Sequence, residues 1–250
     1  MQVGNGLSAH PGTNQGDPWR IAAGLPGAVP QGAVGERHYA VLVADYSGVF
    51  IAIEGGDGSG KSTQARLLAR RLRDAGQEVV LTYEPGDTRI GPDVRRLVLD
   101  VASEGLDARA EALLYAADRA EHVAATIRPA LRRGAVVITD RYIDSSIAYQ
   151  GAGRGLGVDE IAALSAFATG GLLPDLTVVL DVPEDIRRPR ITGLGDRLER
   201  EAAEFHETVR QAYLRRAAVD PDRYLVVDAS LPPADLADLI AEHVEKVANR

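Results

Sequence analysis

The chain has 250 residues, 45% of them hydrophobic, and a formal net charge of −8 at pH 7. This length supplies one good-sized core and an extension, and the acidic balance argues against a general nucleic-acid binder, which shows a basic face. The sequence contains no cysteine, which excludes disulfides, zinc–thiolate sites and thiol catalysis and agrees with a reducing cytoplasm.

The first 36 residues differ in composition from the rest of the chain. Gly and Pro supply 12 of them, a share above the roughly 25–30% that is typical of low-complexity disorder. The N-terminus lacks the basic-then-apolar pattern of a signal peptide, and no apolar run approaches the roughly 18 residues of a membrane helix. We therefore expect a cytoplasmic protein without a membrane partner, with a disordered or poorly ordered extension at 1–47 and one domain at 48–250.

A glycine-rich loop follows the first strand-like segment, 49–53. The segment 55–62 fits G-x-x-x-x-G-K-[ST], the pattern of a phosphate-binding loop. Apolar residues at helical spacing then predict a helix over 62–75 that ends at Gly76. Strand, glycine loop and helix are the context that this motif requires, so we expect the loop to bind a nucleoside triphosphate. The expected contacts with this nucleotide are Gly55, Gly56, Asp57, Gly58, Ser59, Gly60, Lys61, Ser62 and Thr63.

The residue types of this loop explain its chemistry. Glycines let successive backbone N–H groups turn toward an anion, and the N-terminus of the helix adds a partial positive charge. Lys61 is expected to reach the β- and γ-phosphates, and the Ser62 hydroxyl is expected to bind Mg²⁺. The alternative is a chance glycine turn between a strand and a helix, which the complete spacing and both flanks disfavour.

Strand-like and helical segments alternate from this loop to the C-terminus. Near-continuous aliphatic runs predict strands buried on both faces over 49–53, 78–83, 135–139, 176–180 and 224–227. Helical spacing predicts helices near 62–75, 91–100, 108–133, 158–169, 199–218 and 233–248. This alternation favours an α/β fold in three layers, α/β/α, with a five-stranded parallel sheet and helices on both faces. In such sheets the ligand lies at the carboxyl ends of the strands.

The third strand-like run leads into Asp140 and Arg141. An acidic residue in this place commonly serves Mg²⁺, directly or through water, and an arginine beside it can hold a second phosphate. An ion pair that caps the strand is the alternative. The segment that follows favours a substrate site because it is dense in hydrogen-bonding side chains: Ser145, Ser146, Tyr149 and Gln150. Other arginines, such as the pair Arg95-Arg96, are interpreted as solvated helix faces.

A second group lies inside the expected helix 108–133. Tyr115 and Arg119 are four residues apart and therefore share one face of the helix. An aromatic ring one turn from an arginine can stack on a base while the guanidinium binds the edge of that base. A core tyrosine near a surface ion pair is the alternative.

Several of these segments together resemble the thymidylate kinase family. They occur in the family's order and spacing at 55–63, 84–86, 114–120, 140–146, 148–155 and 196–199. The resemblance covers the chain from about residue 49 to its end. It implies the P-loop nucleoside-monophosphate kinase fold, transfer of the ATP γ-phosphoryl group to dTMP with Mg²⁺ in dTTP synthesis, and a homodimer.

The resemblance also implies roles for individual residues. Asp57 and Arg141 are expected at the dTMP phosphate, and Arg119 at the carbonyl edge of thymine. Tyr115 stands where the family usually has a Phe stacked on thymine, and a Tyr stacks equally well. Tyr149 is expected to crowd the 2′ position of ribose. Substrate contacts are expected from Glu84, Pro85, Tyr115, Arg119, Arg141, Ser145, Ser146, Tyr149 and Gln150. Metal contacts are expected from Ser62, from Asp57, and from Asp140 directly or through water.

Two departures from the family pattern concern the phosphate sites. Tyr83 stands where the family commonly has an arginine, and Gly58 stands where some members carry an arginine finger inside the phosphate loop. A catalytic arginine is therefore expected from the lid, about 183–197, because the transferring phosphoryl group needs positive charge around it.

Among the lid arginines we favour Arg190 as the finger. Arg188 is the next candidate, and Arg197 is expected to be a structural or adenine-side residue. The expected catalytic residues are Lys61, Asp57, Arg141 and Arg190.

Three other interpretations stay open. A sister nucleoside or nucleotide kinase with a different base preference would keep both phosphate sites, since Tyr115 and Arg119 suit thymine without being exclusive to it. A degenerate homologue that binds nucleotide without turnover would account for Tyr83 and the irregular lid. A nucleotide-dependent regulator is disfavoured because the sequence has no guanine-binding Asn/Thr-Lys-x-Asp motif and because a second phosphate site would have no use.

Overall fold

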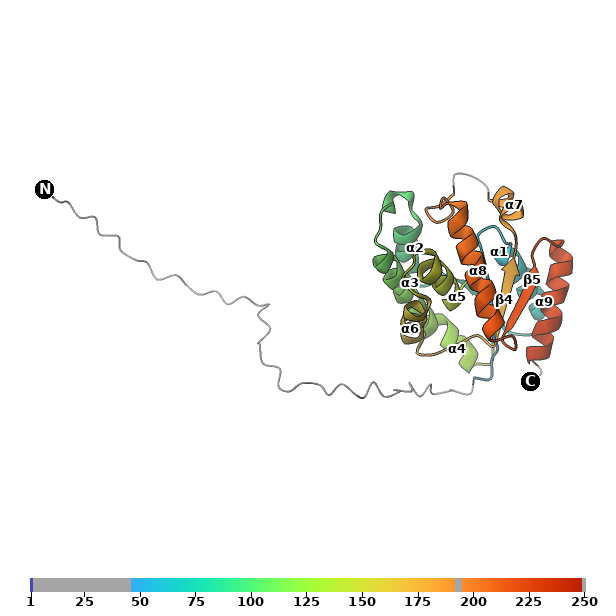
Figure 1. Ribbon diagram of the computed structural model, residues 1–250. Helices are drawn as coiled ribbons and strands as arrows, with labels where there is room; N and C mark the ends of the chain where they lie inside the picture. The colour runs from blue at the N-terminus through green and yellow to red at the C-terminus, as the bar shows by residue number, and fades with distance from the viewer. Residues whose placement is uncertain (2–45, 192–194, 249–250) are drawn as a thin grey trace, which may run out of the picture. The chain divides into compact units, whose positions relative to one another are not determined.

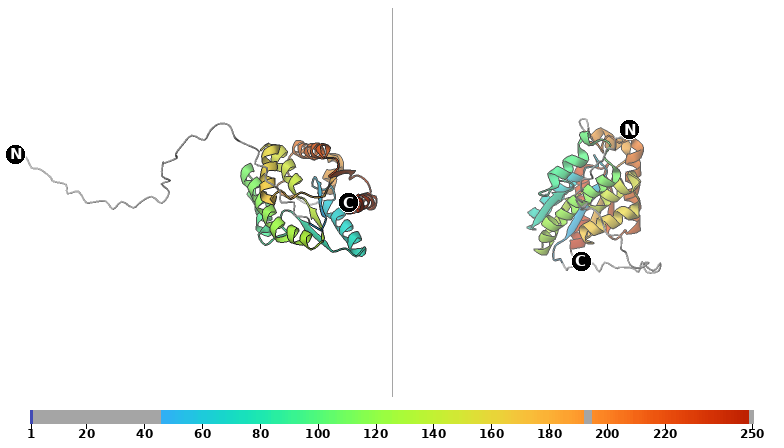
Figure 2. Two further views of the ribbon diagram at one scale, coloured as in Figure 1. Left: turned by 90° about the horizontal axis from the view of Figure 1, so that it is seen from below. Right: turned by 90° about the vertical axis from the view of Figure 1, so that its left-hand side faces the viewer.

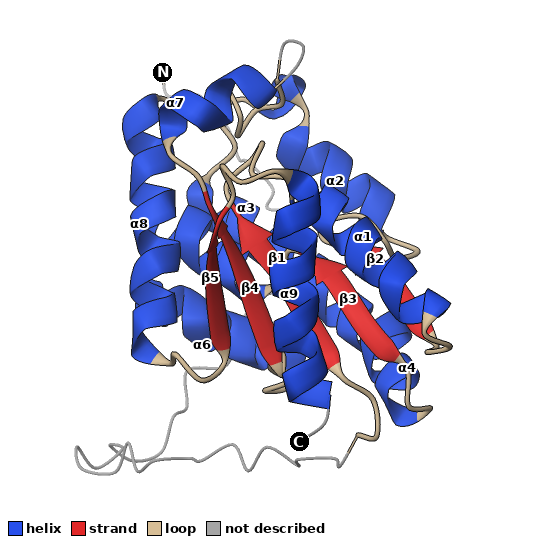
Figure 3. Cartoon of the chain, turned by 90° about the vertical axis from the view of Figure 1, so that its right-hand side faces the viewer, coloured by secondary structure: helices blue, strands red, loops and turns tan. Residues whose placement is uncertain are grey.

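A parallel sheet forms the centre of the computed structural model, which describes Met1, residues 46–191 and residues 195–248. In this part of the chain the sheet has five strands in the order β2-β3-β1-β4-β5 (Figure 3). All five predicted strands are confirmed, each within one or two residues at its ends. Their bounds are β1 Phe50–Gly55, β2 Val79–Tyr83, β3 Val136–Asp140, β4 Leu176–Asp181 and β5 Tyr224–Asp228.

The helices lie on both faces of this sheet, as the alternation predicted (Figures 1 and 3). The longer helices are α1 Lys61–Asp74, α2 Gly91–Leu99, α3 Ala108–His122, α6 Val158–Thr169, α8 Ala203–Val219 and α9 Pro233–Ala248. The shorter helices are α4 Arg128–Arg132, α5 Ile143–Ser146 and α7 Glu184–Arg187. Two π-helical segments, η2 Val123–Ile127 and η3 Ile147–Gly153, and two 3₁₀ segments, η1 Val101–Ser103 and η4 Arg188–Arg190, complete the described elements.

Successive side chains of β1 point to opposite faces of the sheet, and each face packs against its own layer of helices. Ile51 and Ile53 pack against α1 and α9 on one face, while Phe50 and Ala52 pack against η2 and α4 on the other. All four side chains are at most 1% exposed, which explains why the strand reads as a continuous apolar run rather than an alternating one. The layers can be followed from two further directions in Figure 2.

Two helix predictions need correction. The single helix expected over 108–133 is interrupted by the π-helical turn η2 between α3 and α4. The helix expected to begin at 199 begins at Ala203. In addition, the helical stretch formed by α5 and η3 was not predicted, because its buried side chains include Ser145, Ser146 and Gln150 rather than an apolar stripe.

The register of the sheet brings the expected site residues together. Ile53 of β1 is opposite Asp140 of β3, and the backbone N–H of Arg141 donates to the Ile53 carbonyl at 3.0 Å. The phosphate loop that follows β1 therefore begins beside the Asp140–Arg141 pair. This places the first and second expected phosphate sites at one edge of the sheet, where the strands end.

Most of the expected extension at 1–47 lies outside the described residues. Tyr46, however, is partly buried, and Arg128 donates to its hydroxyl at 2.8 Å. Gly48 N–H donates to Leu131 carbonyl at 3.1 Å. The start of the domain at residue 48 stays a prediction, and the contacts of Tyr46 favour a start slightly before it. Among the described residues, no helix combines the length and apolarity needed to cross a bilayer.

Candidate functional site

A cavity of about 1130 Å³ opens at the carboxyl ends of the strands. This volume slightly exceeds the roughly 300–1,000 Å³ of a typical small-molecule site, so it has room for two nucleotides. It brings together most of the residues predicted from the sequence. The predicted residues that line it are Asp57, Gly58, Ser59, Gly60, Lys61, Ser62, Thr63, Glu84, Pro85, Tyr115, Asp140, Arg141, Ser145, Ser146, Tyr149, Gln150 and Arg190. Gly55, Gly56 and Arg119 are predicted site residues that do not line it.

The phosphate loop has the backbone that its glycines predict. Gly58 and Gly60 have φ values of 75° and 96°, in the left-handed region that favours glycine. Lys61 Nζ donates to the Gly56 carbonyl at 2.8 Å, which holds the lysine across the loop. Burial and the nearby charge of Arg141 lower the pKa of Lys61 to about 8. A bound anion beside Lys61 would raise this pKa and keep the lysine charged.

Ser62 and Asp140 form the expected metal-binding edge. Ser62 Oγ donates to Asp140 Oδ2 at 2.5 Å, so two hard oxygen ligands of the kind that Mg²⁺ prefers lie together. In the described part of the chain no group of three or more His, Cys, Asp or Glu side chains could hold a metal by itself. These two oxygens fit an ion that takes its remaining ligands from nucleotide phosphates and water.

Asp57, Arg141 and Tyr149 form a second cluster at the mouth of the phosphate loop. Arg141 Nη2 pairs with Asp57 Oδ1, and the Tyr149 hydroxyl donates to Asp57 Oδ2 at 2.8 Å. Although burial opposes ionisation, the positive charges of Arg141 and Lys61 hold the pKa of Asp57 well below its usual range. The Asp57 carboxylate is thus bonded to Arg141 and Tyr149 and makes no contact with Ser62 or Asp140.

Arg141 has an unusual backbone that aims its side chain into the cavity. Its φ of 75° is the one positive φ among the non-glycine residues that the structure describes, and such strain concentrates at functional sites. Its Nη1 donates to Ser145 Oγ at 3.1 Å, and Ser145 Oγ in turn donates to Glu54 Oε2 at 2.6 Å. Burial and the neighbouring Asp144 raise the pKa of Glu54 to about 7.

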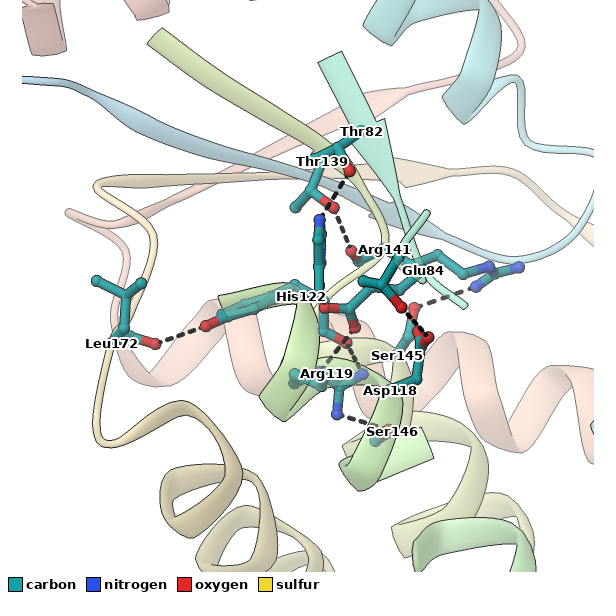
Figure 4. Close-up of polar contacts among 12 residues, drawn as sticks. Thr82, Glu84, Asp118, Arg119, His122, Thr139, Arg141, Ser145, Ser146 and Leu172 are labelled. Atoms are coloured by element: carbon teal, nitrogen blue, oxygen red, sulfur yellow. Dashed lines mark hydrogen bonds and ion pairs between the residues drawn. The ribbon is translucent and has the colours of Figure 1, made fainter. Parts of the chain in front are cut away.

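Arg119 is buried beneath the cavity, at 1% exposure. Its three nitrogens donate to Glu84 at 2.8 Å, to Ser146 Oγ at 3.0 Å and to the Tyr142 carbonyl at 2.9 Å. Figure 4 shows this arginine between Glu84 and Ser146. Two of its five N–H groups remain for a ligand. Tyr115, one turn away on α3, lines the cavity. Of the predicted pair, Tyr115 therefore reaches the cavity surface, and Arg119 is buried below it.

His122 supports Glu84 from the side opposite Arg119. The imidazole is 0% exposed; its Nδ1 lies 2.8 Å from Glu84 Oε1 and its Nε2 lies 2.7 Å from Thr82 Oγ1 (Figure 4). Thr82 also donates to Asp87 at 2.7 Å. Glu84 is therefore fixed by two buried partners. Its position in the wall of the cavity, directly above Arg119, agrees with a role in holding Arg119 in place.

Comparison with known proteins places this site in a family. A family model described as thymidylate kinase matches residues 53–240. The thymidylate kinase of Clavibacter michiganensis subsp. michiganensis (strain NCPPB 382) is 55% identical over 197 residues, which cover 78% of this chain and 93% of that protein. The chain belongs to the thymidylate kinase family.

A second relative and a solved structure agree with this family. The thymidylate kinase of Cutibacterium acnes (strain DSM 16379 / KPA171202) is 49% identical over 203 residues, covering 81% of this chain and 99% of that protein. The crystal structure of thymidylate kinase from Ehrlichia chaffeensis has a TM-score of 0.63 and 35% identity, covering 80% of this chain and 98% of that chain. The predicted family and fold are confirmed.

The arginines of the predicted lid have three different environments in this member of the thymidylate kinase family. Arg190 lines the cavity and donates to the Ala229 carbonyl at 2.9 Å. Arg188 is exposed. Arg197 is buried, pairs with Glu111 and donates to the Val98 carbonyl at 2.8 Å. Arg187 is buried and donates to the Asp57 carbonyl at 3.1 Å. Residues 192–194 of the lid lie outside the described residues.

Arg95 of α2 is a cavity residue that the sequence interpretation missed. Its Nη1 donates to the Pro85 carbonyl at 2.8 Å, and its guanidinium lies 5.8 Å from the centre of the Tyr83 ring. Arg95 thus adds a positive charge beside the departure from the thymidylate kinase pattern at Tyr83. Arg89, the nearest arginine that follows Tyr83 in the sequence, is exposed. No sequence signal separates Arg95 from its neighbour Arg96, because the two differ only in which face of α2 they occupy.

Proposed function

We propose that the protein phosphorylates dTMP to dTDP, using the γ-phosphoryl group of ATP with Mg²⁺. The observation that carries this proposal is that one cavity joins a phosphate loop to a second, arginine-lined anion site. Lys61 belongs to the first site and Arg141 to the second. A protein that only bound or hydrolysed ATP would not need the second anion site. Family membership supports the same reaction.

In this reaction an oxygen of the dTMP phosphate attacks the γ-phosphorus, and the bond from that phosphorus to the β–γ bridging oxygen breaks. The acceptor oxygen is already anionic, so no general base is needed, and positioning and charge stabilisation supply the catalysis. We assign Lys61 to the ATP phosphates and Arg141 to the dTMP phosphate. Asp57 holds Arg141 in place. We assign Arg190 to the transferring phosphoryl group, because it is the arginine of the described part of the lid that lines the cavity.

We assign Mg²⁺ to the Ser62–Asp140 edge, where two oxygen ligands already lie together. When bound there, the ion would neutralise charge on the nucleotide phosphates. The contact of Asp57 with the metal through water, expected from the sequence, stays a prediction, since its carboxylate is held by Arg141 and Tyr149.

We assign the thymine base to the part of the cavity lined by Tyr115, Ser146 and Gln150. The ring of Tyr115 can stack on the base. Arg119 lies below Ser146 with two N–H groups unused, so it would bind the base edge only if the ligand or Ser146 gives access to it. Tyr149 is packed against Arg141 and Asp57, which supports its placement near the sugar.

We propose a homodimer that forms through the outer faces of α3 and α6. These helices pack against each other, and they expose Leu113 at 59% and Phe167 at 79%. Large apolar side chains exposed together on neighbouring helices are typical of association surfaces. We also propose that the enzyme works in the cytoplasm on small molecules and has no nucleic-acid partner, in line with its acidic charge and its lack of cysteine.

The test is ADP release by the purified full chain with ATP and Mg²⁺, comparing dTMP with dUMP, dCMP, dGMP and AMP. We expect turnover with dTMP, weaker turnover with dUMP and little with the others. Equal or greater turnover with another monophosphate would identify a sister kinase instead. Binding of dTMP without turnover of any monophosphate would identify a degenerate homologue.

A further inference from the structure

Glu111 of α3 is fully buried, at 0% exposure, and three donors surround it. Gln150 Nε2 donates to its Oε1 at 2.8 Å, and Arg154 Nε lies 3.4 Å from the same oxygen. Arg197 pairs with its Oε2. The two guanidinium groups compensate the buried negative charge, without which it would be strongly unfavourable.

This arrangement determines which way the Gln150 amide points. A carboxylate oxygen only accepts hydrogen bonds, so the NH₂ group of Gln150 must face Glu111. Gln150 is 2% exposed and lines the cavity. In the part of the chain that the structure describes, no donor contacts its carbonyl oxygen Oε1. One N–H of the amide is used by Glu111, and the carbonyl oxygen is held on the other side of the amide, where it can accept a hydrogen bond from a ligand in the cavity.

We propose that Glu111 is a positioning residue that makes the enzyme select a pyrimidine with N3–H and reject cytosine; the inference rests on the proposed function. Thymine and uracil carry a hydrogen on N3, which can donate to Gln150 Oε1. Cytosine has a bare acceptor at N3. Binding cytosine would bring two acceptors, its N3 and Gln150 Oε1, face to face and leave both without a hydrogen-bond partner. Unpaired polar groups in a buried site discriminate strongly between ligands.

Replacing Glu111 by Gln should reverse this selection. A glutamine at 111 has one accepting and one donating group. Arg197, which only donates and is the closer of the two arginines, would hold the accepting group at the former Oε2 position, while Arg154, whose Nε is 3.4 Å from Oε1, keeps its ion pair with Glu201. The new NH₂ group would then face Gln150, which must rotate its amide and turn its own NH₂ toward the cavity. The variant would thus offer a donor to the base, which suits cytosine.

The experiment compares kcat/KM for dTMP, dUMP and dCMP in the full-length wild type and in Glu111→Gln. We expect the dTMP-to-dCMP ratio to fall about tenfold or more, because the favourable and the mismatched hydrogen bond exchange places. The dTMP-to-dUMP ratio should stay unchanged, since both bases carry N3–H. A smaller folded fraction lowers all three rates alike and moves neither ratio.

An unchanged dTMP-to-dCMP ratio in Glu111→Gln would overturn the inference. A wild type that does not prefer dTMP to dCMP would overturn the proposed function instead, so the two failures are distinguishable. Glu201→Gln is the matched control, since Glu201 also pairs with Arg154, at 2.6 Å, without contacting Gln150. It should keep the wild-type ratio; the same fall in both variants would trace the effect to lost charge and contradict the proposal.

Gln150→Met provides a second test if Glu111→Gln fails to fold. It keeps Glu111 with both of its arginines and removes the amide that faces the base. We expect the dTMP-to-dCMP ratio to fall about tenfold here as well, because the acceptor for N3–H is gone. A ratio equal to that of the wild type would show that Gln150 does not select the base, and the inference would be overturned.

Discussion

The phosphate-loop lysine gives a pH prediction that can be worked out from the structure. Lys61 is 6% exposed, and burial together with Arg141 lowers its pKa to about 8. ATP binding requires its charged form. Because kcat/KM reports the free enzyme, kcat/KM for ATP should fall above pH 8, and at pH 9, one unit above that pKa, about one tenth of the molecules keep the charge.

The assay is kcat/KM for ATP between pH 7 and pH 10, with dTMP held well below its KM so that the free enzyme is the form reported. We expect a decline approaching tenfold per pH unit above about pH 8.5, while kcat holds to higher pH because bound triphosphate raises the pKa of Lys61. Lys61→Arg is the matched control, since an arginine stays charged throughout this range. Its profile should be flat, at a lower level. A flat wild-type profile, or the same decline in Lys61→Arg, would refute the reasoning.

The same lysine affects the stability of the nucleotide-free protein, with a sign that can be checked. Between pH 8 and pH 10.5 the folded chain binds fewer protons at Lys61 than the unfolded chain does. The free energy of unfolding should therefore rise with pH in this window, by on the order of 3 kcal/mol from this group. Lys61→Met should lack this rise, and the difference between the two proteins in denaturant unfolding isolates it.

Three further predictions concern the lid, the start of the domain and the association surface. Arg190→Ala should lower kcat on the order of a thousandfold, the lower range for a lost arginine finger, whereas Arg188→Ala should keep it; near-normal kcat in Arg190→Ala would remove this assignment. A chain that starts at residue 48 should unfold about 1 kcal/mol more easily than one that starts at Tyr46, because Arg128 loses one of its hydrogen bonds and keeps those to the carbonyls of Thr169 and Gly170; equal melting temperatures would contradict this. Phe167→Glu should give a monomer in light scattering if α6 forms the dimer surface, and an unchanged dimer would place that surface elsewhere.

The strands and the phosphate loop could be predicted because local sequence determines them. A buried parallel strand must be apolar on both faces, and β1 and β4 are. The loop needs glycines where φ is positive, and Gly58 and Gly60 supply them. The sheet then brings Asp140 to the loop without further information, since parallel strands end at one edge.

The positions of the arginines could not be predicted in the same way. A sequence shows that Arg119 shares a helix face with Tyr115, but not that Glu84 and Ser146 hold it below the cavity. Conversely, Arg95 resembles any surface arginine until the turn containing Pro85 folds against it. In both cases the position of the arginine depends on contacts with residues that lie far away in the sequence. The same holds for Glu111, whose donors come from residues 39 to 86 positions away.

The close packing at Gly58 limits how this enzyme can be remodelled by evolution. A Cβ built on Gly58 would lie 3.0 Å from the Arg187 carbonyl oxygen and 3.2 Å from Ile191 Cγ1, and the φ of 75° would strain any other residue. The beginning of the lid thus occupies the space that a side chain at position 58 would need. An arginine inside the loop would therefore need the lid backbone at Arg187 and the side chain of Ile191 to shift, so a lineage that moved its finger from one place to the other would have to adjust both segments together.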